Sequence, residues 1–315
     1  MRIVTASAVL WLLLCPLAGS RAGAAEPLIK PTDRVLFLGD SITHAGHYVT
    51  QIEATLRKAH PGTVPDLINL GLPSETCSGL SEPDHPWPRP NVHERLDRAL
   101  AKTKPDVVFA CYGMNDGIYY PLAEERFAAY RRGVDLLIKK VKATGAKLIL
   151  MTPPAFDPLP LKKKGKLLPA GAKKYSYFAI YEDYDSILKH YAMWVMQQHE
   201  RVDLVVDLHT PVLNYVAQRR EADPNFTMSP DGVHVNREGH RVLAVAILTA
   251  LGYQPTAAGK ELLMLVETRQ KLLHDSWLSH VGHKRPGVKT GLPLEQAEAK
   301  AMELDRQIAE LNRAR

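Results

Sequence analysis

Five short apolar runs constrain the fold of this chain more than any other feature of its sequence. Within each run, apolar residues follow one another without alternating with polar ones, as in strands covered on both faces of a parallel sheet. Helical patterns separate the runs, which gives the repeated strand and helix order of a doubly wound α/β fold. The runs cover residues 34–39, 67–70, 107–111, 147–151 and 204–208, and the helical patterns about 48–58, 92–102, 122–143 and 177–199. We therefore expect a doubly wound, five-stranded parallel sheet.

The strand pattern ends at Gly252, and the remaining sequence is helical. Two stretches, about 260–273 and 294–311, carry apolar residues at helical spacing together with regular charges. We expect one sheet domain over 25–252 and a helical extension over 253–315 that packs on the same body. A lid over the site and a dimer contact remain alternatives for this extension, and the sequence predicts neither the oligomeric state nor a role for residues 277–287.

The first residues have the features of an export signal. Arg2 precedes an apolar run over residues 9–14, and Ala22, Gly23 and Ala24 provide small residues of the kind that signal peptidase cleaves after. The apolar run is shorter than the about 20 residues that span a bilayer. We expect residues 1–24 to be a cleaved signal peptide and the mature protein to be secreted or periplasmic, without stable membrane insertion.

Composition excludes several other classes of protein. A hydrophobic content of 45% and a charged content of 23% are those of an ordinary globular chain. The net charge of +6 comes partly from one Lys-rich segment and the rest of the chain is balanced, which argues against a nucleic-acid-binding surface. Only Cys77 and Cys111 follow the predicted signal, so at most one disulfide can form, and whether the two pair is left open.

Two loops interrupt the regular alternation of strands and helices. The Lys-rich loop, residues 157–174, could attract an anionic substrate such as a uronate, or could be an ordinary solvated loop. A Pro-rich loop, residues 83–90, contains Trp87, which could stack on a sugar or simply hold the loop in place.

Ser41 directly follows the first strand and precedes a helix. Ligand sites of doubly wound sheets lie beyond the carboxyl ends of the strands, so this position is suited to a nucleophile. A serine before a helix is also an ordinary cap, and the assignment therefore needs partners elsewhere in the sequence.

Three further residues at strand ends or turns supply those partners. Asp231 and His234 are three residues apart, so a carboxylate can orient an imidazole within one turn. Asn115 follows the third strand and offers an amide donor that does not titrate, as an oxyanion hole requires. Their occurrence together at one end of the predicted sheet favours acyl-ester chemistry.

Four ordered blocks make the sequence resemble the GDSL, or SGNH, hydrolase family, whose sheet is of the flavodoxin-like kind. They read Gly-Asp-Ser at 39–41, Asn-Leu-Gly-Leu-Pro-Ser-Glu-Thr at 69–76, Gly-Met-Asn-Asp at 113–116 and Asp-Gly-Val-His at 231–234, and the resemblance spans about residues 34–251. It implies that Ser41 is the nucleophile, His234 the general base and acid, and Asp231 its orienting carboxylate. It also implies that Asn115 and the backbone N–H of Ser41 stabilise the oxyanion.

The third oxyanion donor in this family is usually the N–H of a glycine in the second block, and here that position holds Ser74. A backbone N–H does not need glycine, so Ser74 can donate if its backbone conformation permits, and Gly71 is the fallback. Asp40, Gly71 and Trp87 are further candidates for contact with the substrate.

The resulting prediction is a serine ester hydrolase that cleaves acetyl or short-chain esters, with a carbohydrate ester or polysaccharide as the favoured substrate. A lysophospholipase or acyltransferase of the same family, and a non-catalytic carbohydrate-binding module, are the alternatives. An α/β-hydrolase would carry Gly-x-Ser-x-Gly in mid-chain, with its acid and histidine well separated. Here Ser41 lies near the start of the mature chain and Asp231 is three residues from His234, which excludes that class. No His, Cys and carboxylate spacing typical of a metal site occurs, so we expect no metal and no cofactor.

Overall fold

A five-stranded parallel sheet forms the centre of the protein in the computed structural model, which describes residues 27–60 and 62–313. The predicted signal peptide lies outside the described residues. The strands are β1 (Arg34–Gly39), β2 (Asp66–Asn69), β3 (Val107–Cys111), β4 (Lys147–Met151) and β7 (Leu204–Val206), in the order β2-β1-β3-β4-β7. This is the predicted doubly wound fold, and the point where the strand order reverses lies between β1 and β3.

The strands form where the sequence is continuously apolar because both faces of the sheet are covered. All five residues of β3 are buried, as are five of the six in β1. Phe37 of β1 stacks on Phe109 of β3 with ring centroids 4.6 Å apart. No polar face remains on these strands, which explains why apolar and polar residues do not alternate in them.

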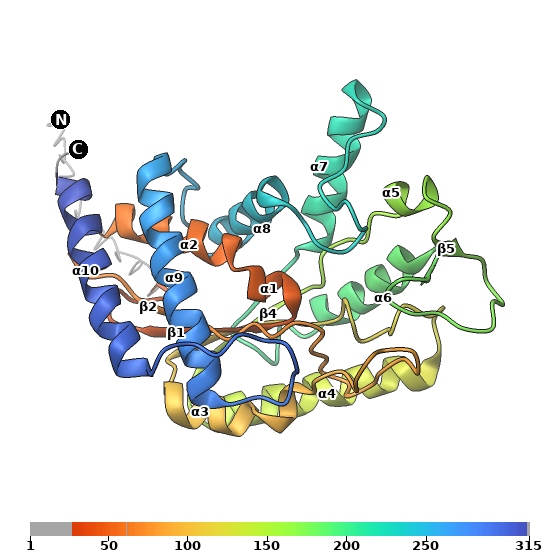
Figure 1. The fold of residues 1–315 in the computed structure, drawn as a ribbon, viewed down its shortest axis with the longest axis horizontal. Helices are drawn as coiled ribbons and strands as arrows, with labels where there is room; N and C mark the ends of the chain where they lie inside the picture. Colours follow the sequence, from red (N-terminus) through yellow and green to blue (C-terminus); the bar gives the residue numbers. More distant parts are fainter. Residues whose placement is uncertain (1–26, 61, 314–315) are drawn as a thin grey trace, which may run out of the picture.

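Helices cover both faces of the sheet (Figure 1). On one face lie α2 (His47–Ala59) and α8 (Arg237–Ala250), which pack against each other. On the other lie α3 (Leu96–Thr103), α4 (Glu124–Lys142) and α6 (Tyr184–Met196). Tyr130 of α4 stacks on Tyr191 of α6 at 4.5 Å, which joins the last two helices. The three-layer arrangement leaves the carboxyl ends of the strands free for loops.

Smaller elements fill the connections. They are α1 (Ser41–Ala45), the 3₁₀ turn η1 (Val92–Glu94), α5 (Leu159–Lys162), the two-stranded pair β5 (Leu167–Leu168) and β6 (Ile180–Tyr181), and α7 (His209–Ala222). The helix predicted over 177–199 is shorter than expected, because β6 occupies its first part. The Lys-rich loop contains α5 and β5.

The C-terminal extension packs along the edge of the sheet that β2 forms. It consists of α9 (Lys260–Val281) and α10 (Leu294–Arg313). From α9, the side chain of Gln270 donates to the carbonyl of Leu67 at 3.1 Å, and His274 Nε2 bonds to the carbonyl of Gly71 at 3.1 Å. The first contact satisfies a backbone acceptor of the edge strand β2, and the second satisfies one in the loop that follows it.

A group of charged side chains, buried except for the partly exposed Asp305, joins α10 and α9 to α2. Glu53 and Asp305 are the carboxylates, and Arg57 lies between them at 2.7 and 2.6 Å. Arg269 contacts the same two carboxylates at 3.3 and 2.8 Å. Because Glu53 is only 1% exposed, its charge depends on these two arginines, one of which the extension supplies.

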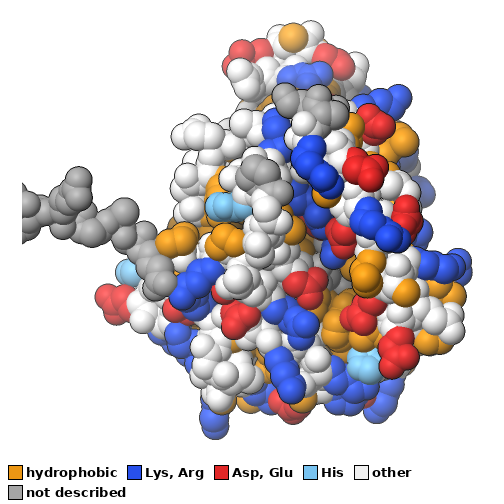
Figure 2. Space-filling model, turned by 90° about the vertical axis from the view of Figure 1, so that its left-hand side faces the viewer, with side chains coloured by type: hydrophobic (Ala, Val, Ile, Leu, Met, Phe, Trp, Pro, Cys, Tyr) orange, Lys and Arg blue, Asp and Glu red, His pale blue; other side chains and the backbone are white. Residues whose placement is uncertain are grey.

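The surface on the α10 side of the molecule carries both signs of charge. Figure 2 shows Lys and Arg side chains interspersed with Asp and Glu there, rather than gathered into one patch. Cys77 and Cys111 are free and buried, so they form no disulfide with each other. Within the described ranges, no helix is both long enough and apolar enough to cross a bilayer.

Candidate active site

Ser41 begins α1, directly after β1 ends at Gly39. The residue between them, Asp40, caps the helix by accepting the N–H of Ile42 on its carboxylate at 2.9 Å. The N–H of Ser41 has no hydrogen-bond partner among the described residues, as is usual in the first turn of a helix. Both the hydroxyl and the amide of Ser41 are therefore available at the end of the sheet.

Asp231 and His234 lie on a tight turn just before α8. Oδ1 of Asp231 accepts the N–H groups of Val233 and His234, at 3.0 and 2.8 Å. Gly232 has φ 81°, and a Cβ there would come within 2.5 Å of the ring of Phe156. The turn thus requires glycine at this position, and it presents both side chains on the same side.

These three residues form one hydrogen-bonded chain. His234 Nδ1 lies 2.6 Å from Asp231 Oδ2, and His234 Nε2 lies 2.8 Å from Ser41 Oγ. A carboxylate only accepts hydrogen bonds, so the ring proton is on Nδ1 and the hydroxyl of Ser41 donates to Nε2. This is the arrangement of a nucleophile, a base and the group that orients the base.

The electrostatics of the chain agree with that arrangement. Burial tends to lower the pKa of His234, but the hydrogen bond and the charge of Asp231 outweigh it, and the net shift is upward. For Asp231, burial acts to raise the pKa, and the hydrogen bonds and charge of His234 lower it to about 2. Both shifts favour a charged carboxylate beside a basic imidazole.

Burial also raises the pKa of Asp40 to about 6, against the hydrogen bond from Ile42 and the charge of His234. Its side chain is 4% exposed and does not line the cleft described below. Asp40 was a sequence candidate for substrate contact, and the structure places it as the cap of α1 rather than on the cleft wall.

Asn115 follows β3 in a turn that fixes its side-chain amide. Tyr119, four residues further on with φ 65°, donates its hydroxyl to Asn115 Oδ1 at 2.9 Å. Nδ2 of Asn115 contacts the carbonyl of Glu75 at 3.3 Å. The acceptor oxygen is thus engaged by Tyr119, and the amide nitrogen is held beside the loop that carries Ser74.

Ser74 adopts the left-handed backbone conformation, with φ 67°. A residue with a Cβ rarely adopts it, which accounts for the glycine expected at this position and makes Ser74 a strained residue. Its N–H has no hydrogen-bond partner in the described part of the chain. The N–H of Gly71, by contrast, donates to Asn69 Oδ1 at 2.8 Å, so Gly71 is the weaker candidate for an oxyanion donor.

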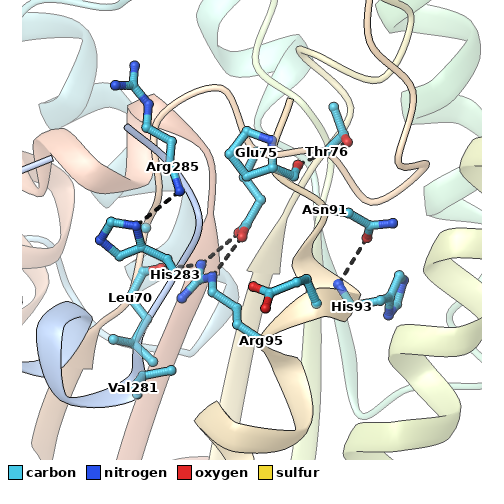
Figure 3. A network of polar contacts seen from close by, with 12 residues as sticks. Leu70, Glu75, Thr76, Asn91, His93, Arg95, Val281, His283 and Arg285 are labelled. Atoms are coloured by element: carbon cyan, nitrogen blue, oxygen red, sulfur yellow. Dashed lines mark hydrogen bonds and ion pairs between the residues drawn. The ribbon is translucent and has the colours of Figure 1, made fainter. Parts of the chain in front are cut away.

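A buried ion pair between Glu75 and Arg95 holds the loop that contains Ser74 (Figure 3). Arg95 contacts both carboxylate oxygens of Glu75, each at 2.7 Å, and donates to the carbonyl of Leu70 at 2.6 Å. Tyr112 adds a third hydrogen bond to Glu75, at 2.6 Å. Since Glu75 and Arg95 are at most 1% exposed, this pair fixes the loop against the body of the protein.

The polar groups open into a cleft of about 290 Å³. Ser41, Asn115 and His234 lie on it together with Ser74 and Trp87, so the structure brings these sequence candidates together. The remaining lining residues are Pro73, His85, Pro86, Arg89, Tyr119, Tyr177 and Arg285. Trp87 is half-buried in the wall, beside His85 at 5.4 Å between ring centroids.

Seven of the twelve lining residues were not among the sequence candidates, and three of these seven show why. Arg89 stands between two prolines of the Pro-rich loop, a segment already noted, but its pairing with Glu82 at 2.6 Å has no signature in the sequence. Tyr119 and Arg285 carry no motif at all. Among the described residues, no group of His, Cys, Asp and Glu side chains is placed to hold a metal ion.

Comparison with known proteins places the chain in a family. The model of the GDSL-like lipase/acylhydrolase family matches residues 37–242, which is more than half of the chain. A search of curated protein sequences gives no significant match.

Several solved structures share the fold. A catalytic mutant of an acetylxylan esterase from Geobacillus stearothermophilus is 21% identical, with a TM-score of 0.54, and the match covers 74% of this chain and all of that one. Another acetyl xylan esterase is 20% identical, with a TM-score of 0.51 over 69% of this chain and 98% of that one. A gut microbial diltiazem-metabolizing enzyme is 22% identical, with a TM-score of 0.57 over 71% of this chain, which spans about half (48%) of that enzyme. With the family match over the residues that build the site, the chain belongs to the GDSL-like lipase/acylhydrolase family and is a carboxylic ester hydrolase.

Proposed function

We propose that the protein hydrolyses short-chain acyl esters with Ser41 as nucleophile, His234 as general base and acid, and Asp231 as the orienting carboxylate. The observation that carries this proposal is the unbroken hydrogen-bonded chain from Ser41 through His234 to Asp231, at 2.8 and 2.6 Å. This chain of hydrogen bonds opens on a cleft beside three donors. The N–H groups of Ser41 and Ser74 have no partner among the described residues, and the amide of Asn115 is held in place by Tyr119.

The reaction follows from these positions. Ser41 Oγ attacks the ester carbonyl carbon while its proton passes to His234 Nε2, and the three donors stabilise the negative charge that develops on the carbonyl oxygen. His234 then gives the proton to the leaving alcohol as the ester C–O bond breaks, which leaves an acyl group on Ser41. A water molecule attacks this acyl group by the reverse sequence and releases the carboxylic acid.

The lining of the cleft favours a small acyl group. Apart from Pro73 and Pro86, its walls are aromatic or polar, and no Leu, Ile, Val, Met or Phe side chain of the described chain lines it. Burial of a long acyl chain would need such side chains, at about 0.8 kcal/mol for each methylene removed from water. An acetyl ester suits this site better than a lysophospholipid does.

The rest of the substrate would lie against the aromatic residues His85, Trp87 and Tyr177, which line the cleft and contact one another through their rings. Such walls suit a sugar, which has apolar ring faces and hydroxyl edges. The likeness in fold to acetylxylan esterases agrees with this choice. We propose an acetylated carbohydrate as the substrate and, from the N-terminal sequence, export of the mature enzyme.

A substitution at Ser41 tests the chemistry. Ser41→Ala should abolish turnover of 4-nitrophenyl acetate while the circular dichroism spectrum stays unchanged, because the side chain is small and only half-buried. Ser186→Ala, at an exposed site on α6, is the matched control and should keep full activity. Wild-type turnover by Ser41→Ala would refute the proposal.

A substrate panel tests the specificity. Acetylated xylan, acetylated pectin, 4-nitrophenyl acetate and a lysophospholipid should be compared by kcat/KM. Acetyl esters are expected to be the better substrates, and a preference for the lysophospholipid would refute the proposed substrate class.

A further inference from the structure

The C-terminal extension contributes a residue to the rim of the candidate active site. Arg285 lies in the segment between α9 and α10, yet it lines the same cleft as Ser41 and His234. Its guanidinium lies 4.7 Å from the centre of the Trp87 ring, and its Nε donates to the carbonyl of Pro73 at 3.4 Å. Figure 3 shows this side chain pointing away from the buried Glu75 and Arg95 pair. The extension therefore does more than cover the edge of the sheet.

The two arginines of the cleft differ in their partners. Arg89 is buried and bound by both carboxylate oxygens of Glu82, at 2.6 and 2.7 Å, so its charge is balanced within the protein. Arg285 forms no ion pair with a carboxylate among the described residues, and its contacts are the Trp87 ring and backbone carbonyls. Its positive charge is left unbalanced at the mouth of the cleft.

No acidic side chain of the described chain lines this cleft. Asp40, next to Ser41 in the sequence, accepts the N–H of Ile42, and Asp231 is bound to His234. An anionic group of a substrate would thus meet an unpaired guanidinium and no repelling carboxylate on the cleft wall.

The Lys-rich loop reaches both sides of the same region. Lys174 pairs with Asp84 at 3.3 Å, next to His85 of the cleft. Lys164 donates to the carbonyl of Pro230 at 3.3 Å, next to Asp231. Lys164, which has no carboxylate partner among the described residues, thus adds positive charge next to Asp231, and such charge attracts anions from solution.

We propose that Arg285 is a specificity-determining residue that binds a carboxylate on the ester substrate. The proposal rests on the proposed function of the site. A guanidinium offers two parallel N–H donors that match a carboxylate, and such hydrogen bonds between charged groups are the strong ones. The substrate class is accordingly an acetyl ester of an acidic sugar, whose carboxylate binds Arg285 where this residue lies over the Trp87 ring.

A purely structural role for Arg285 predicts a different result. If the residue only held the Trp87 loop, its replacement would change the turnover of charged and neutral esters by the same factor. A substrate-binding role requires the effect to depend on the charge of the substrate, so the ratio of two turnover rates separates the two roles.

The test compares an acetylated galacturonide oligosaccharide with the same oligosaccharide after methyl esterification of its carboxylates, by acetate release from the full-length protein. The wild type should favour the free acid in kcat/KM by about tenfold, as expected for a charged hydrogen bond. Arg285→Gln should bring this ratio close to one, and Arg285→Lys should keep part of the preference. Lys284→Gln, which removes the same charge from the exposed neighbouring residue, should keep the wild-type ratio.

Each outcome decides between the two proposals. Equal turnover of the acid and the methyl ester by the wild type, or an unchanged ratio in Arg285→Gln, would overturn the role of Arg285 and leave the proposed esterase intact. Absence of any turnover of 4-nitrophenyl acetate by the wild type would overturn the proposed function, and the role of Arg285 with it.

Discussion

Replacement of Asn115 should slow catalysis far more than it destabilises the protein. The side chain is 3% exposed, and Tyr119 holds its oxygen at 2.9 Å so that the amide nitrogen faces the neighbourhood of Ser74. Loss of one preorganised oxyanion donor reduces kcat by about 10² to 10³, equivalent to about 2.7–4 kcal/mol of transition-state stabilisation. We expect a loss of this size for Asn115→Ala, with little change in KM.

The contact with Tyr119 sharpens this expectation. Tyr119→Phe keeps the donor but removes the hydrogen bond that orients it, which is worth about 1 kcal/mol and so about fivefold in kcat. In the Asn115→Ala background, Tyr119→Phe should have no further effect on kcat, because the group it orients is gone. Additive losses in the double variant would show that Tyr119 acts independently of Asn115.

The assay is steady-state hydrolysis of 4-nitrophenyl acetate by the wild type, both single variants and the double variant. Chemical unfolding of each protein provides the control, since Asn115→Ala leaves the Tyr119 hydroxyl buried without its partner at a cost of about 1–3 kcal/mol. A folded Asn115→Ala protein with kcat within threefold of the wild type would refute the oxyanion role of this residue.

Three further predictions concern the base, the strained residue and the buried ion pair. His234 must be neutral to accept a proton, and Asp231 raises the pKa of His234 above its ordinary value. The kcat/KM should therefore fall as the pH drops through an inflection above 6.5. In a pH-rate profile, Asp231→Asn should move this inflection to lower pH. Ser74→Gly and Ser74→Ala should both keep kcat within about threefold, because the expected donor is the backbone N–H, and a loss of 10² or more in both would assign the role to the hydroxyl instead. Arg95→Met should lower the free energy of unfolding by about 3–5 kcal/mol, because it leaves the carboxylate of Glu75 buried and unpaired, and an unchanged urea midpoint would contradict this.

The strands were the most predictable part of the fold. The predicted ranges of β1, β3 and β4 coincide with the observed ones, and that of β2 is displaced by one residue. Both faces of these strands are covered, so each appears as an uninterrupted apolar run that needs no knowledge of the tertiary structure. The run predicted over 204–208 is two residues too long, because β7 ends where Asp207 turns back to bond with Thr152 and the N–H of His209.

Helix α7 was not predicted, and its packing explains why. Only His209, Val212 and Val216 are buried along its 14 residues, so the sequence lacks the apolar stripe that marks an amphipathic helix. The helix predicted over 177–199 begins too early, because α6 starts only at Tyr184. Tyr177 and Phe178 lie before it, where both are substantially exposed and Tyr177 lines the cleft.

Sequence motifs identified the residues that the structure brings together as a hydrogen-bonded chain, but not the residues that line the cleft around them. Ser41, Asn115, Asp231 and His234 lie in short blocks at strand ends, and such local signals survive in a single sequence. The position of Arg285 depends on the course of α9 along the edge of β2, and the pairing of Arg89 with Glu82 depends on a loop conformation. Contacts of this kind arise from the tertiary structure and have no spacing rule.

Covalent labelling of Ser41 is the most direct measurement of the central claim, that this serine is an activated nucleophile. The folded protein would be treated with a fluorophosphonate, digested, and the modified peptide identified by mass spectrometry, with Ser41→Ala and His234→Ala in parallel. We predict one adduct, on Ser41, absent from Ser41→Ala and formed far more slowly in His234→Ala. An unmodified Ser41 in the folded wild type, or labelling that survives in Ser41→Ala, would contradict the account.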